Sequence, residues 1–102
     1  MNQDLIFQQI GQLSQVSRSK GKKEEDASKD AFNFVKGLLK KADVVVRAYP
    51  TSNKELIFHQ MSSQAFSLFH TNDNQNEILE TVFKSVLNYV EMSKKLAEEF
   101  TV

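Results

Sequence analysis

The sequence has no cysteine and no tryptophan, and it contains only three glycines and one proline. Without cysteine, a disulfide framework, a thiolate zinc site and a cysteine nucleophile are all excluded. So few glycines and prolines leave little material for the tight turns of a hairpin-rich all-β fold. The sequence therefore favours a helical protein whose core is built from other large side chains, among them eight phenylalanines.

An excess of charge of one sign and a long apolar run are also missing. Lysine and arginine number 13, as do aspartate and glutamate, so the formal net charge is zero. A dedicated nucleic-acid-binding protein usually has a basic excess, so we expect no nucleic-acid partner. No stretch approaches the ~20 apolar residues that span a bilayer. The run Leu5-Ile6-Phe7 is too short for a signal peptide and follows no basic segment. We therefore expect a cytoplasmic protein with no membrane span.

The sequence does contain four segments in which apolar residues recur at the three- and four-residue spacing of a helix. These segments are about 4–17, 27–48, 53–69 and 75–100, and residues 18–26, which include no apolar residue, are predicted to form an exposed linker. The β-branched run at 44–46 could instead be a strand, but the helical register continues through it. We predict a single all-α domain over residues 1–102, an antiparallel up-down four-helix bundle.

Helix ends and core residues can also be predicted. Pro50 ends the second helix because it disfavours helical geometry at the residue before it. Ser52 with Glu55 matches a capping box for the third helix, and Asn74 with Glu77 is a second possible cap. The residues that we expect to be buried are Phe32, Leu38, Phe58, Phe83 and Val86.

No group of residues matches a catalytic or metal-binding motif. The glutamate pairs 24–25 and 98–99 lie in charge runs, where a solvated surface is expected. Ser62, Ser63 and Ser67 lack the Gly-x-Ser-x-Gly context and are expected on a helix surface. His59 and His70 are eleven residues apart, roughly 16 Å along a helix, so they cannot share a metal ion. We expect no enzymatic activity, no cofactor and no metal site.

One short stretch suggests an alternative. His59-Gln60-Met61-Ser62-Ser63-Gln64-Ala65 resembles the motif of histidine phosphotransfer domains, four-helix bundles with a phosphorylated histidine exposed in mid-helix, in its histidine and in Met61. The resemblance implies that His59 is the phosphoacceptor. The sequence departs from the motif at Ser62, where the family has lysine, and at Ser63, where it has glycine.

The preferred hypothesis rests on helix length. The second and fourth segments are the longest, so their ends are expected to extend beyond the other two helices, and the end of the fourth is either exposed or covered by the second helix alone. That end carries Met92, Leu96, Phe100 and Val102. An exposed apolar patch of this kind usually marks a protein interface. We therefore expect a non-enzymatic protein–protein interaction module, a small regulator, adaptor or inhibitor, which binds a protein partner and forms a homodimer.

Overall fold

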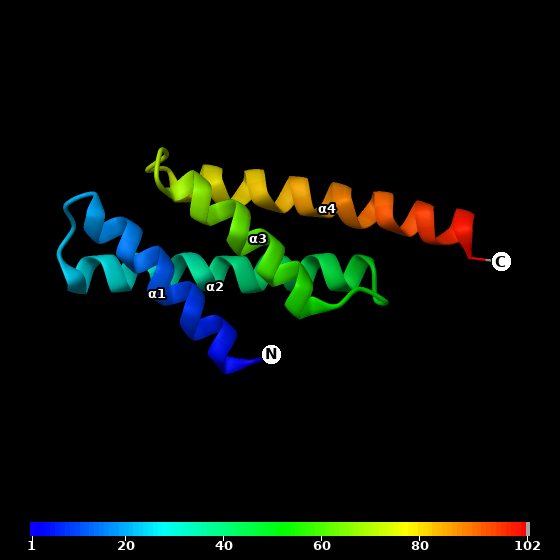
Figure 1. Cartoon of the computed structure of the whole chain (residues 1–102), viewed down its shortest axis with the longest axis horizontal. Coiled ribbons are helices and arrows are strands. Elements are labelled where there is room, and N and C mark those ends of the chain that lie inside the picture. The colour runs from blue at the N-terminus through cyan, green and yellow to red at the C-terminus, as the bar shows by residue number, and fades with distance from the viewer. Residues whose placement is uncertain (102) are drawn as a thin grey trace.

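The computed structural model describes residues 1–101 and shows four α-helices with no strand in that range (Figure 1). Their bounds are Gln3–Ser19 for α1, Glu24–Ala48 for α2, Lys54–Phe69 for α3 and Gln75–Phe100 for α4. The predicted all-α four-helix bundle is confirmed. The alternative of a strand at 44–46 is wrong, because these residues lie within α2.

The helices alternate in direction along the chain, so that α1 and α3 run one way and α2 and α4 the other (Figure 1). The two middle helices, α2 and α3, each pack against all three others. Within residues 1–101, α1 and α4 share no packed interface and lie on opposite sides of the α2–α3 pair. One side of α4 is therefore not covered by α1.

Asparagine side chains cap three of the four helices. The Asn74 side chain accepts a hydrogen bond from the Glu77 N–H at 3.1 Å, which confirms that predicted cap. The predicted capping box at Ser52 is wrong, because the cap of α3 is Asn53, whose side chain accepts from the Leu56 N–H at 3.1 Å. The Glu55 carboxylate turns away from the helix start and accepts from the Asn2 N–H at 3.0 Å.

The connection between α1 and α2 is shorter than predicted. Residues 18–26 are all exposed, but α1 continues to Ser19 and α2 already begins at Glu24. Gly21 turns the chain between them with a φ of 97°, a value that glycine adopts without strain. Three acidic residues in the first turn of α2 extend that helix toward its N-terminus, because negative charge is favoured there. At its other end, α2 stops before Pro50, as predicted.

The core lies between α2 and α3 and takes one face from each of the other helices. Leu38, Phe58 and Val86 are buried as predicted, whereas Phe83 is only partly buried. The prediction for Phe32 is wrong, because its side chain is 57% exposed. At 100° per residue, the core-facing side of α2 includes Phe34 and leaves Phe32 on the flank. The buried Phe34 ring contacts the Phe69 ring edge-on, with centroids 4.8 Å apart.

The approach of α2 to α4 depends on Gly37. A Cβ at this position would lie 3.0 Å from Cδ2 of Leu79, so the two helices meet where α2 has no side chain. Farther along the same contact, the Lys41 ammonium lies 4.6 Å from the ring centroid of Phe83 and 3.0 Å from Oε1 of Glu80. These contacts hold the first half of α4 against the bundle.

In the described range, no helix has an apolar stretch long enough to cross a membrane.

Candidate functional site

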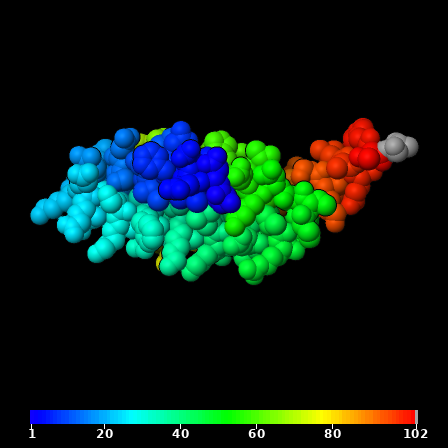
Figure 2. All heavy atoms as spheres, turned by 90° about the horizontal axis from the view of Figure 1, so that it is seen from below, coloured from blue at the N-terminus to red at the C-terminus, as the bar shows by residue number. Residues whose placement is uncertain are grey.

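The last third of α4 projects beyond the rest of the molecule (Figure 2). With 26 residues, α4 spans about 39 Å, whereas α3 beside it has only 16 residues. Every residue of α4 from Glu91 to Phe100 is exposed. This projection contributes to the elongated shape of the molecule, whose principal extents are 54 × 26 × 17 Å.

The apolar row of α4 continues onto this projection without changing direction. Within the bundle the row contains Leu79, Val82 and Val86, and beyond it come Tyr89, Ser93, Leu96 and Phe100, always three or four residues apart. Residues at this spacing lie on one side of a helix. The face that α4 buries in the bundle is therefore the face that it exposes beyond it.

Four large apolar side chains make up what we call the α4-end surface. The exposed fractions are 51% for Tyr89, 52% for Met92, 55% for Leu96 and 75% for Phe100. Three of these residues were predicted from the sequence, and the fourth predicted residue, Val102, lies outside the described residues. Sequence reasoning missed Tyr89, because its place in the apolar row resembles that of a core residue. Only the position at which α3 begins shows that half of the Tyr89 side chain is left exposed.

A groove extends the α4-end surface onto the start of α3. It has a volume of about 440 Å³ and lies between Leu56, Ile57 and Gln60 of α3 and Val86, Tyr89, Val90 and Ser93 of α4. Leu56 at its rim is 68% exposed. The groove is shallow and open to solvent, and it places apolar side chains of a second helix beside the exposed row.

The charged residues of the projection lie away from the apolar row. Lys94 is 3.9 Å from the Glu98 carboxylate and lies 5.7 Å from the ring centroid of Tyr49, in the loop between α2 and α3. Loss of solvent around the Tyr49 hydroxyl, together with the nearby Glu91 carboxylate, raises the pKa of Tyr49. An apolar stripe with a charged, solvated rim is the usual composition of a protein interface.

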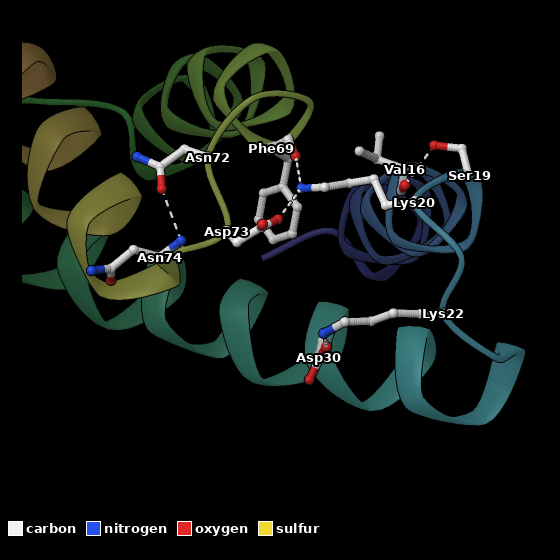
Figure 3. Close-up of polar contacts among 9 residues, drawn as sticks. All are labelled: Val16, Ser19, Lys20, Lys22, Asp30, Phe69, Asn72, Asp73 and Asn74. Atoms are coloured by element: carbon white, nitrogen blue, oxygen red, sulfur yellow. Dashed lines mark hydrogen bonds and ion pairs between the residues drawn. The ribbon is translucent and has the colours of Figure 1, made fainter.

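The opposite end of the molecule carries a polar cluster that joins the two loops there (Figure 3). The Lys20 ammonium lies 2.7 Å from the Asp73 carboxylate and also donates to the Phe69 carbonyl oxygen. Lys22 pairs with Asp30 on α2. The Lys20 ammonium holds the pKa of Asp73 below its usual value, and the hydrogen bond to Asp30 raises the pKa of Lys22. We call the contacts among Lys20, Phe69 and Asp73 the loop clamp. Because each charge has a partner, we interpret the cluster as structural.

The two histidines lie on α3 and at its end. His59 is exposed, and its side chain has no hydrogen bond or ion pair with residues 1–101. His70 is also exposed, with its ring edge-on to Phe66 at a centroid distance of 5.1 Å.

The expectation that Ser62 lies on the surface is wrong, because its side chain is buried and the hydroxyl has no hydrogen-bond partner. In the phosphotransfer motif this position holds the lysine that faces the phosphoryl group, so a buried serine provides no such cation.

The structure brings no set of metal ligands together over residues 1–101: no group of three or more histidine, aspartate or glutamate side chains could hold a metal ion. Comparison with known proteins finds no matching protein family, no similar curated protein and no similar solved structure. The function is therefore inferred from the residues and geometry of the chain itself.

Proposed function

We propose that this chain is a non-enzymatic protein-interaction module, a small cytoplasmic regulator, adaptor or inhibitor that binds a protein partner through the α4-end surface. The observation that supports the proposal is the α4-end surface itself, in which Tyr89, Met92, Leu96 and Phe100 are each at least half exposed. Contiguous apolar patches on a small protein usually mark a binding surface. A chain without cysteine is also compatible with a reducing compartment.

Other exposed apolar side chains do not form such a row. Phe7, Phe32 and Val44 are also exposed, but they lie on two different helices and far apart in sequence. Isolated apolar residues are common on protein surfaces and require no partner. The α4-end surface is distinguished by having four such residues on consecutive turns of one helix.

Helix stability also supports a partner. The projection makes few contacts with the rest of the chain, and its one ion pair along the helix is the solvated Lys94–Glu98 pair. Isolated helices shorter than ~12–15 residues are marginal in water, and the projection, although it continues a helix nucleated in the bundle, has no packed apolar face of its own. Covering the half-exposed row gives a gross gain on the order of 5 kcal/mol, before the cost of association. A gain of this size offsets only the lower end of that cost, so a stable complex also needs the apolar surface that the partner itself buries.

Photocrosslinking tests the proposal with a matched pair of sites. Phe100 is 75% exposed and Phe7, on the outer side of α1, is 74% exposed. Each can be replaced by the photoreactive analogue benzoylphenylalanine and irradiated in cells that express the protein. We expect a discrete protein adduct from position 100 that is lost with Leu96→Asp, and no corresponding adduct from position 7. The same adducts from both positions would contradict the proposal.

The alternative of phosphotransfer through His59 makes a different prediction. Its ring is exposed, but Glu55, one turn earlier on α3, is an acid, and a nearby negative charge disfavours a phosphoryl group. Under the interaction proposal, acetyl phosphate labels the wild type no more than the His59→Gln variant. Stoichiometric labelling that is lost in His59→Gln would favour the phosphotransfer function instead.

A further inference from the structure

We infer that the occupant of the α4-end surface is a second copy of this chain, whose α4 projection lies antiparallel to the first across a two-fold axis between residues 94 and 95. The inference rests on the proposed function and adds the identity and orientation of the partner. It is carried by the register of the exposed row, the position of the groove and the area available, and the charged residues lie outside the proposed contact.

The exposed row is symmetric about its own midpoint. Tyr89 and Phe100 are equally far from the point between residues 94 and 95, and so are Ser93 and Leu96. In an antiparallel pair, Phe100 therefore faces Tyr89 of the other copy, and Leu96 faces Ser93. A large side chain thus meets a small one in the central layers, as efficient packing requires. The two identical patches complement each other, which is the condition for a two-fold interface.

Ser93, the polar residue in the row, can be covered without leaving an unpaired group. Its hydroxyl already donates to the Val90 carbonyl oxygen at 2.8 Å within α4. A buried hydroxyl is costly only when it lacks a hydrogen-bond partner. The centre of the proposed interface is therefore compatible with exclusion of water.

The groove lies at the level that the antiparallel register requires. Tyr89 and Phe100 are about 16 Å apart along the helix, at 1.5 Å per residue. Phe100 of the second copy then reaches the groove between α3 and α4, next to Leu56 and Tyr89. The same contact is repeated at the other end of the pair. A parallel arrangement would place Phe100 against Phe100 and leave both grooves empty.

Charge neither favours nor strongly opposes this pairing: the register sets Glu91 level with Glu98 and Lys94 level with Lys95 of the other copy, but these side chains lie outside the contact. Glu91, Lys94, Lys95 and Glu98 lie on the sides of α4 that face away from the row. Ion pairs on those sides remain solvated and contribute little. Like charges therefore do not meet in the centre of the interface.

The area available reaches the lower limit for a specific dimer interface. Leu56 and the four residues of the α4-end surface are each at least half exposed. If large side chains bury ~150–250 Å² each when fully covered, these five contribute roughly 500–700 Å² per copy. The total of about 1,000–1,400 Å² lies at the lower end of the range for specific protein interfaces.

Sedimentation analysis tests the presence of the dimer. We expect the wild type to be dimeric at micromolar concentration and the Leu96→Asp/Phe100→Asp variant to be monomeric, with its dissociation constant raised about 100-fold or more. The control Phe7→Asp, of matched exposure but on α1, should remain dimeric. Circular dichroism should show that all three bundles are folded. A monomeric wild type would overturn the inference, while an adduct at position 100 with a different protein would still support the proposed function.

Cysteine crosslinking tests the orientation, without background because the chain has no cysteine. We expect a mixture of Tyr89→Cys and Phe100→Cys proteins to form a disulfide-linked heterodimer on oxidation. Neither variant alone should crosslink, because identical positions lie about 16 Å apart in the antiparallel pair, beyond the reach of a disulfide. Crosslinking of each variant with itself, and not in the mixed pair, would show a parallel arrangement and overturn the inference, as would the absence of any crosslink.

Discussion

At the scale of single residues, Ser62 stands apart from the rest of the core. Its hydroxyl is the one buried side-chain polar atom of residues 1–101 without a hydrogen-bond partner. Such a group carries a desolvation penalty of about 1–3 kcal/mol that folding does not recover. We expect Ser62→Ala to leave the free energy of unfolding unchanged or to raise it by up to about 1 kcal/mol, because only one small polar atom is removed.

Urea unfolding of Ser62→Ala measures this effect, and the exposed neighbour Ser63 provides the control. Ser63→Ala should change stability by no more than about 0.5 kcal/mol, as surface substitutions usually do. A loss of more than about 1 kcal/mol in Ser62→Ala would mean that the hydroxyl is paired in solution.

Two phenylalanines that the sequence pattern cannot distinguish differ in burial. Phe58 is fully buried, whereas Phe83 is partly exposed beneath the Lys41 ammonium. We expect Phe58→Ala to cost about 3–5 kcal/mol and Phe83→Ala clearly less, since less apolar area is lost from the interior. Chemical unfolding of both variants compares them directly. Equal losses would show that the two rings are buried to the same extent.

Residue-scale burial was only partly predictable from the sequence. The spacing correctly predicted Leu38, Phe58 and Val86, because each lies near the middle of a helical stripe. It failed for Phe32, which lies at the edge of a wide stripe, where the direction of the neighbouring helix decides what is covered. That direction depends on tertiary packing, which periodicity within a single helix does not encode.

At the scale of elements, the start of α3 shows how local signals compete. Ser52 and Asn53 are both good capping residues, and the Glu55 spacing favoured Ser52. The structure selects Asn53, and the Glu55 carboxylate accepts instead from the N–H of Asn2, the N-cap of α1. The capping box therefore does not form, and its glutamate makes a tertiary contact in its place.

The assignment of Asn53 as the cap predicts different effects on stability for substitutions at two neighbouring positions. Asn53→Ala should destabilise the protein by about 1 kcal/mol, because the Leu56 N–H loses its acceptor. Ser52→Ala should have little effect. Thermal unfolding of the two variants under the same conditions compares their stabilities. A larger loss of stability in Ser52→Ala than in Asn53→Ala would show that Ser52 is the cap and would contradict this assignment.

The loop clamp predicts a dependence of stability on pH. The Lys20 ammonium lowers the pKa of Asp73 in the folded protein, so the pair stabilises the fold above the ordinary carboxyl pKa, and the stabilisation is lost as pH falls through the lowered value. Asp73→Asn should therefore melt at a slightly lower temperature than the wild type at neutral pH. Because Asp73 is largely exposed, the difference should be small and should shrink in high salt.

Calorimetry of both proteins across the acidic range tests the sign of this effect. The two melting temperatures should converge as the pH falls below the ordinary carboxyl pKa of about 4. A difference that persists unchanged at strongly acidic pH would show that the ion pair does not cause it.

At the scale of the whole molecule, the sequence predicted the number of helices and the class of fold, because four periodic segments have few other ways to bury their apolar faces. Helix length also predicted that the second and fourth helices extend beyond the other two, but it left open whether the second helix, which is nearly as long, covers the end of the fourth. The sequence could not predict the groove beside Leu56 or the exposure of Tyr89, since both depend on where α3 begins relative to α4. The sequence thus identified the helix end that carries the candidate surface, but it did not show how far the surface extends along α4 and onto α3.

The most direct test of this account is amide hydrogen exchange along α4 as a function of protein concentration. If a second copy covers the α4-end surface, amides of residues 92–100 should exchange slowly at high concentration and much faster on dilution below the dissociation constant. Amides around Phe58 in the bundle core should not change with concentration. Exchange in residues 92–100 that is the same at every concentration would contradict the claim that the projecting end of α4 is covered by another copy.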